Sequence, residues 1–141
     1  SRIAFEESSD DSSSLINRAV IQYGGGCCYY GGITLVEASP TIQNTIVAYG
    51  NYYGILAHNS QPTLGCNDIF GNGSYGFYNA TLGNLVIAEN QWWGSSSGPY
   101  HPFTNPTGLG NAVTDGVDYV PWRASSCSSP EFKVFLPIVV R

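Results

Sequence analysis

Apolar and polar residues repeat along this chain with a short and nearly constant period. Three triplets of similar character begin at Asn44, Asn67 and Asn90, in two steps of 23. The triplet that begins at Tyr53 returns in similar form at Tyr75, a step of 22. Two Pro-Thr-apolar triplets make a third register, also with a step of 22. Three registers that agree on one period indicate a repeat protein.

The residues within each repeat are those of short strands and turns. Apolar pieces rich in Ile, Val, Thr and Tyr alternate with Gly, Asn, Ser and Pro, which is the composition of strands joined by bends. No segment carries a helical period, and the leucine scaffold of a leucine-rich repeat is missing. The pattern predicts an all-β parallel β-helix, a solenoid of about four coils whose strands stack about 4.8 Å apart.

The alternation within the predicted strands indicates which side chains point inward. Ile3-Ala4-Phe5 aligns with Ile33-Thr34-Leu35 in a step of 30, so we expect an insertion in the first coil, within loops 6–14 and 24–32. The predicted inward residues are Ile3, Phe5, Ile21, Ile33, Leu35, Ile42, Ile46, Ile55, Leu64, Ile69, Phe77, Ile87 and Trp92.

Asparagine recurs where the predicted coil bends. Asn is depleted in strands but adopts the left-handed conformation that a sharp bend requires. Amides stacked in successive coils hydrogen-bond along the column. We therefore expect Asn44, Asn67 and Asn90 to form a structural ladder, which starts at Asn44 because Ala19 holds the earlier position.

The repeat stops after Gly94. Prolines make residues 95–107 a loop, and Val113 and residues 117–120 predict the strands of a C-terminal β cap. The chain divides into a β-helix with its cap (1–122), a linker (123–130) and an apolar C-terminal strand or tail (131–141). We expect that strand to act in assembly through Phe132, Val134, Phe135, Leu136, Ile138, Val139 and Val140.

These coils resemble those of a known superfamily. The segment Asn90-Gln91-Trp92-Trp93-Gly94, followed by Gly98-Pro99 and by Pro121-Trp122, resembles the closing motif of secreted bacterial and archaeal β-helix proteins. The resemblance is to the right-handed parallel β-helices of the pectate-lyase-like superfamily, and it covers residues 1–122. It implies a right-handed solenoid and a secreted chain. The superfamily includes lyases, hydrolases, adhesins and non-catalytic scaffolds, so it implies no single activity.

Composition narrows the class of partner. Only 11% of the residues are charged, and the net charge is −5 with five basic residues, which disfavours nucleic acid and anionic membranes. No apolar run approaches the length of a membrane span, about 18 residues or more. The chain starts with Ser1 rather than Met, and we interpret it as processed. We expect an extracellular or cell-surface protein.

Four cysteines are candidates for disulfides: Cys27, Cys28, Cys66 and Cys127. Their spacing is not that of a zinc site. Because adjacent cysteines rarely bond to each other, we expect Cys27 and Cys28 each to find a distant partner. Three connectivities and intermolecular pairing all remain open.

Other polar and aromatic residues offer weaker signals. Two sequons make Asn72 and Asn79 candidates for glycosylation. Asp10 and Asp11 lack the ligand spacing of a calcium loop. Tyr53 and Tyr75 share one column, which we expect to stack on the outside. No column holds two carboxylates, which a glycosidase needs, so the sequence predicts no catalytic, metal or cofactor site.

The sequence favours a non-catalytic secreted structural subunit. The amino-terminal coil has no capping helix, and the apolar strand 131–141 is suited to add to the open coil of another copy. Repetition would make an extracellular filament or surface layer. The alternative is a carbohydrate-binding or adhesin module that uses its tyrosine columns, and behind it a polysaccharide lyase or hydrolase fragment.

Overall fold

The computed structural model describes residues 1–128 of the 141-residue chain. The predicted assembly strand 131–141 lies outside the described residues. Residues 1–128 form short strands without a helix, so no helix there is long and apolar enough to cross a membrane. The strands are β1 (Ile3–Phe5), β2 (Leu15–Asn17), β3 (Val20–Gln22), β4 (Gly31–Val36), β5 (Thr41–Gln43), β6 (Ile46–Ala48), β7 (Tyr53–His58), β8 (Thr63–Leu64), β9 (Asp68–Phe70), β10 (Tyr75–Asn79), β11 (Val86–Ile87) and β12 (Val117–Asp118).

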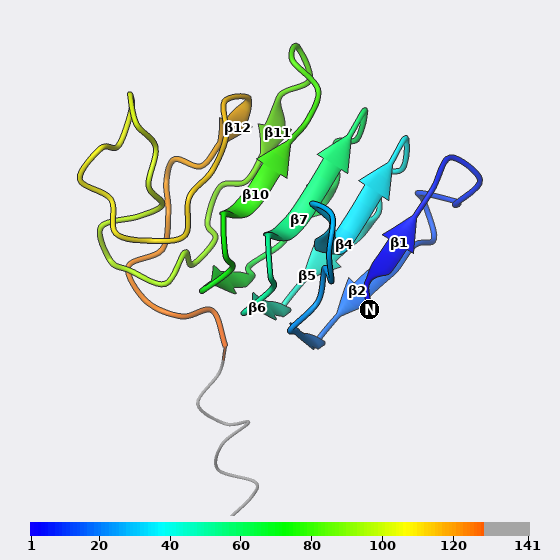
Figure 1. Ribbon diagram of the computed structural model, residues 1–141, viewed down its shortest axis with the longest axis horizontal. Helices are drawn as coiled ribbons and strands as arrows, with labels where there is room; N and C mark the ends of the chain where they lie inside the picture. The colour runs from blue at the N-terminus through cyan, green and yellow to red at the C-terminus, as the bar shows by residue number, and fades with distance from the viewer. Residues whose placement is uncertain (129–141) are drawn as a thin grey trace, which may run out of the picture.

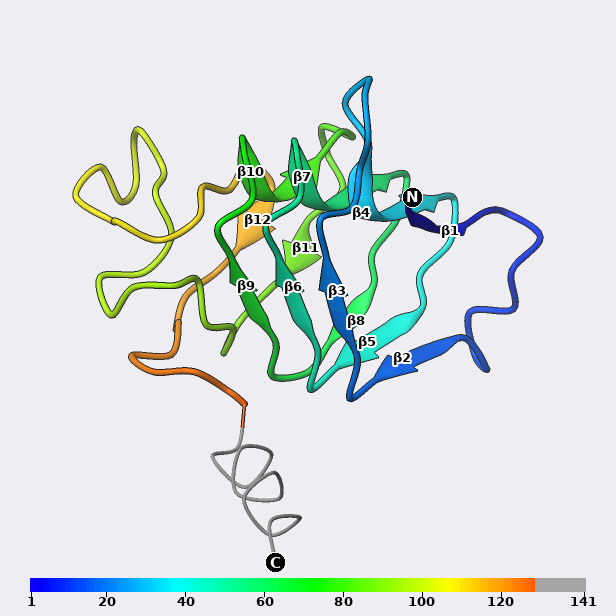
Figure 2. The same cartoon turned by 60° about the horizontal axis from the view of Figure 1, so that its bottom comes forward.

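Every third strand returns to the same sheet up to β10. The sheets have the orders β1-β4-β7-β10, β2-β5-β8 and β3-β6-β9, and a two-stranded sheet joins β11 to β12. All neighbours within these sheets are parallel. Figure 1 shows the first sheet as four arrows side by side, and Figure 2 shows β3, β6 and β9 in the same arrangement. The prediction of an all-β fold with parallel strands is confirmed.

The backbone register follows the predicted repeat in the sheets β1-β4-β7-β10 and β2-β5-β8. Ile3 pairs with Ile33 and Ile33 with Ile55, which confirms the alignments with steps of 30 and 22. Tyr75 pairs with Tyr53 as expected. The Pro-Thr-apolar triplets are also in register, because Thr41 pairs with Thr63 and Ile42 with Leu64.

The core consists of columns of apolar side chains between the sheets. Six predicted inward residues are fully buried: Ile33, Leu35, Ile42, Ile55, Ile69 and Phe77. Four more predicted inward residues lie at the margins of the core. Phe5, Ile21 and Leu64 pack against it, whereas Ile3 is exposed.

For three of the inward residues the prediction is wrong by one position. Ile87 is exposed, and Ile46 and Trp92 are only partly buried. The residues beside them, Val47, Val86 and Trp93, are buried instead. Because successive side chains in a strand point to opposite faces, a slip of one residue exchanges the inward and outward sets.

Candidate functional site

Strands β1, β2 and β3 form one edge of the structure. Each pairs on one side, with β4, β5 and β6 respectively. In residues 1–128 no strand pairs with their other side, and Figure 2 shows β1 and β2 at one margin of the molecule. A strand with one unpaired side presents free backbone N–H and C=O groups to any chain that approaches it. We call β1, β2 and β3 the open edge.

The open edge also exposes the ends of the core columns. Ile3 is 39% exposed, whereas Ile33, its neighbour in the same column, is fully buried. Ile21 is half-buried, whereas its register partner Val47 is 1% exposed. Exposed outward residues add to this apolar surface, with Leu15 at 54% and Val20 at 63%. Within residues 1–128 the edge therefore combines unpaired backbone with exposed apolar side chains.

The opposite end of the stack is covered by residues 111–123, which we call the capped end. Gly76 N donates to Ala112 O at 2.7 Å, and Phe77 forms a parallel bridge with Val113. Further along, β12 pairs with β11, and Asn90 N donates to Pro121 O at 2.6 Å. The predicted cap strand residues Val113 and 117–118 thus pair with the last coil. Trp122 packs against the core.

A buried polar column crosses the sheet of β6 and β9, in a different register from the predicted ladder. Thr45 N donates to Asn67 Oδ1 at 3.0 Å, and Asn67 N and Nδ2 both donate to Gln91 Oε1 at 3.0 Å. Asn67 also donates from Nδ2 to the carbonyl oxygens of Ile42 and Gly65. All three members of the column, Thr45, Asn67 and Gln91, are at most 1% exposed.

The predicted ladder is therefore wrong at Asn44 and Asn90, and only Asn67 belongs to the buried column. Asn44 and Asn90 are exposed bend residues with φ of 51° and 62°, and Asn44 Nδ2 donates to Asn17 Oδ1 instead. The two coils differ in length, because the step from Thr45 to Asn67 is 22 whereas the step from Asn67 to Gln91 is 24. A constant step of 23 averages the two and places the outer members one residue too early.

A second set of amides joins the last full coil to the capped end. Asn72 N and Nδ2 both donate to Asn111 Oδ1 at 2.9 Å, and Asn72 Nδ2 also donates to Val47 O. Asn79 Nδ2 donates to Asn84 O at 2.6 Å and to Gly116 O at 2.9 Å. These amides fasten the capped end to the coil beneath it.

The same contacts contradict Asn72 and Asn79 as glycosylation sites in the folded chain. The atom that would carry the glycan, Nδ2, is hydrogen-bonded in both residues, and the residues are only 7% and 8% exposed. A bulky sugar at either position would displace buried amide bonds.

The cysteines form two disulfides, Cys27–Cys28 and Cys66–Cys127. The expectation that Cys27 and Cys28 each bond to a distant partner is wrong. Cys66 and Cys127 bond to each other, with Cα atoms 5.7 Å apart, an ordinary separation for a disulfide. No distant cysteine is then left for Cys27 and Cys28, which lie together in the loop between β3 and β4, where Cys28 adopts a φ of 77°.

The segment 126–128, within the predicted linker, is tied to β9 beside the Cys66–Cys127 disulfide, and we call it the strap. Asp68 is 3% exposed, and its carboxylate accepts from Cys127 N at 2.6 Å and from Ser126 and Ser128. The carboxylate oxygens thus satisfy donors of the strap, as burial of a carboxylate requires.

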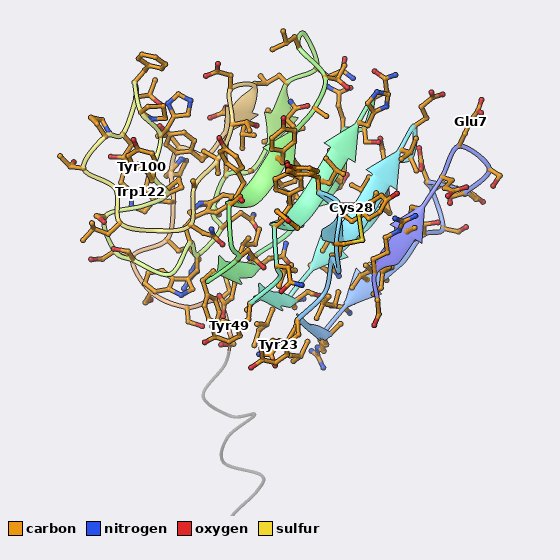
Figure 3. The ribbon with its side chains drawn as sticks, in the orientation of Figure 1. Glu7, Tyr23, Cys28, Tyr49, Tyr100 and Trp122 are labelled. Atoms are coloured by element: carbon orange, nitrogen blue, oxygen red, sulfur yellow. A yellow bond between two sulfur atoms is a disulfide. The ribbon has the colours of Figure 1, made fainter. Side chains whose placement is uncertain are left out.

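The tyrosines form two clusters on the outside of the sheets. Tyr53 and Tyr75 share a column as expected, but their rings are tilted, and Tyr53 stacks on Tyr78 with centroids 4.5 Å apart. Burial, together with nearby Tyr78, raises the pKa of Tyr53. In the other cluster, Tyr23 stacks on Tyr49 with centroids 5.8 Å apart, and both are labelled at the lower margin of Figure 3.

Acidic residues do not gather into a metal-binding group in the described part of the chain. No three His, Cys, Asp or Glu side chains there are placed to hold a metal ion. Asp10 accepts from Ser12 Oγ at 2.6 Å, and hydrogen bonds from Ser12 and Ser13 lower the pKa of this carboxyl. Asp11 accepts from Ser39 N. The acids of this loop thus bind neighbouring donors.

No protein-family model, curated protein or solved structure matches this chain. Function must therefore be inferred from the geometry of the molecule itself.

Proposed function

We propose that this protein is a right-handed parallel β-helix that serves as a non-catalytic, extracellular structural subunit, joined to further copies by strand addition. The observation that carries the proposal is the contrast between Ile3 and Ile33, two members of one core column of which only the inner is buried. A column that ends in water at one face is completed when another layer of strand is placed on it. The circuit of three parallel sheets supports the β-helix.

The proposed occupant of the open edge is residues 132–141 of another copy. This segment, which lies outside the described residues, contains Phe, Leu, Ile and three valines and has only two charged side chains, Lys133 and Arg141. Residues of this kind favour strands and bury well against an apolar edge. Backbone pairing would give affinity, and the alternate side chains would meet the exposed columns.

The last described residues before this segment lie away from the open edge. The strap 126–128 is fixed to β9 by Asp68 and by the Cys66–Cys127 disulfide, and β9 is two strands away from β3 in its sheet. A head-to-tail contact between unlike surfaces does not close on itself unless the rotation allows it, so repetition extends into a filament. The segment beyond 128 spans at most about 45 Å when extended, so the experiment must distinguish addition to another copy from a return to the open edge of the same molecule.

The test compares the full chain with a variant that lacks residues 131–141 and with Val20→Lys. Val20 is exposed on β3, and a lysine there would place a charge on the edge that strand addition must cover. We expect polymers of the full chain by sedimentation velocity and electron microscopy, and monomers of both variants. Leu82→Lys is the matched control, because Leu82 is exposed away from the open edge, and it should polymerise normally.

Several outcomes would refute the proposal. A full chain that stays monomeric at high concentration would show that the segment returns to its own edge or that neither surface assembles. Polymers that persist in the deletion would exclude the segment as occupant. Polymers that persist in Val20→Lys but not in the deletion would exclude the open edge as its receptor.

A further inference from the structure

A hollow of about 580 Å³ lies where the loop of residues 99–110 meets the start of β10 and the capped end. Its volume is within the range of small-molecule sites. The walls come from three separate segments: Ser74 and Tyr75, residues 100–103, and residues 112–115. Figure 3 shows Tyr100 within this loop, far from the open edge. The hollow therefore does not share residues with the proposed assembly surface.

The floor of the hollow is held in place by an imidazole. His101 is 5% exposed, and its Nδ1 accepts from the backbone nitrogens of Phe103 at 3.3 Å and Thr104 at 3.2 Å. Because Nδ1 accepts, the ring hydrogen is on Nε2, which donates to Asp115 Oδ1 at 2.8 Å. With both ring nitrogens bonded, His101 fixes the loop to Asp115.

The turn that carries Asp115 is also anchored to β10. Asn79 N donates to Thr114 Oγ1 at 2.9 Å, and Asn79 Nδ2 donates to Gly116 O at 2.9 Å. Asp115 is thus flanked on both sides by bonded residues. Its side chain is 73% exposed, and its second oxygen, Oδ2, accepts no hydrogen bond from residues 1–128. The result is an immobilised acceptor that faces solvent at the hollow.

Two exposed aromatic residues line the same hollow as this acceptor. Phe103 is 84% exposed and Tyr100 is 43% exposed, although both belong to a loop fixed by backbone bonds. This differs from Tyr53, whose ring is stacked on Tyr78 and is almost fully buried. An exposed ring on a fixed loop offers apolar area without the entropy cost of ordering the loop.

The geometry points to this hollow as a binding site for a neutral sugar. One face of a pyranose ring presents C–H groups that pack on an aromatic ring, and its hydroxyl groups donate to a carboxylate. No lysine or arginine is among the described residues that line the hollow. A uronate would bring its carboxylate to Asp115 with no cation to offset the repulsion, so the site selects neutral over acidic sugars. The ligand class is a neutral oligosaccharide of glucose, galactose or mannose.

The experiment is saturation-transfer difference NMR on the full chain, which remains informative if the chain is polymeric. Neutral trisaccharides of glucose, galactose and mannose are compared with trigalacturonate, and isothermal titration calorimetry gives the affinity. We expect transfer from the protein to the C–H face of a neutral trisaccharide, with a dissociation constant on the order of 1 mM. We expect no comparable signal from trigalacturonate.

Two variants locate the site and one controls for surface aromatics. Phe103→Ala should weaken binding about tenfold because it removes the stacking ring, and Asp115→Asn should weaken it several-fold because it removes the charged acceptor. Tyr23→Ala removes an exposed ring from the other side of the molecule and should bind as the wild type does. The circular dichroism spectra of all three should match the wild type, since the replaced side chains are exposed.

Four results would overturn the site. The first is an absence of transfer to every neutral trisaccharide at about 20 mM. The others are a preference for trigalacturonate, equal affinity in Phe103→Ala and wild type, and equal weakening in Phe103→Ala and Tyr23→Ala. None of these depends on whether the chain forms filaments.

Discussion

The open edge and the capped end finish the same columns in opposite ways. At the capped end, Phe77 is fully buried because residues 112–114 pair with β10. At the open edge, Ile3 stands in the same register column and is 39% exposed. Sequence places an apolar residue at both positions. What differs is the presence of a further backbone layer, so burial in such a stack is decided by the neighbouring layer rather than by the residue itself.

The largest effect should separate these two ends of one column. Phe77→Ala should lower the free energy of unfolding by about 3–5 kcal/mol, because it opens a cavity under the capped end. Ile3→Ala should cost about 1 kcal/mol or less, because Ile3 is already partly hydrated. Urea unfolding followed by circular dichroism measures both. Equal costs at low protein concentration would contradict the comparison, whereas a cost of Ile3→Ala that grows with concentration would indicate a cover supplied by another copy.

The next largest difference in stability is expected between the two disulfides. Cys66–Cys127 joins cysteines with a sequence separation of 61, so replacing both with serine should cost about 2–4 kcal/mol, chiefly by freeing the unfolded chain. Cys27–Cys28 joins adjacent residues and closes no such loop. Its double serine variant should therefore unfold at nearly the wild-type urea midpoint. A larger loss from the adjacent pair than from the distant pair would show that the loop of residues 24–32 holds the open edge together.

The smallest effect should distinguish the buried polar column from the bend asparagines. Gln91→Leu removes the acceptor of two Asn67 donors and should cost about 1–3 kcal/mol, since buried N–H groups are left unpaired. Asn44→Gly keeps a residue that tolerates a φ of 51° and should change stability by about 0.5 kcal/mol or less. Thermal unfolding of both variants makes the comparison. A costlier Asn44→Gly would restore a structural role for the exposed asparagines.

The fold was predictable where one register dominated. Ile33, Ile55 and Phe77 recur in equal steps of 22 and lie in the longest strands, β4, β7 and β10, so their alternation specifies the inward face. The Asn-containing triplets were harder, because the strands there are short. In each of these repeats two neighbouring residues fit the sequence period almost equally well: Asn44 and Thr45 in one, and Asn90 and Gln91 in the other. Only their burial and their hydrogen bonds to Asn67 show that Thr45 and Gln91 are the members of the column.

The remaining features depend on contacts that span irregular loops. Nothing in the period of the repeat places His101 against Asp115 or brings residues 74–75 to the same hollow. Tyr100, His101 and Phe103 are close together in the sequence, but they follow the end of the repeat, where the prolines predict only a loop. The rarity of adjacent disulfides argues against Cys27–Cys28, yet the bond between Cys66 and Cys127 removes the distant partners.

The unequal steps between paired strands have a consequence for how the sequence of this protein can evolve. Steps of 22, 24 and 30 residues all bring the chain back to the same columns. The number of residues between two paired positions is therefore not fixed by the pairing itself. Insertions and deletions are absorbed at the corners, where the loop that carries Cys27 and Cys28 already protrudes (Figure 2). Corners are thus the positions at which new segments can be grafted with the least disturbance to the stack.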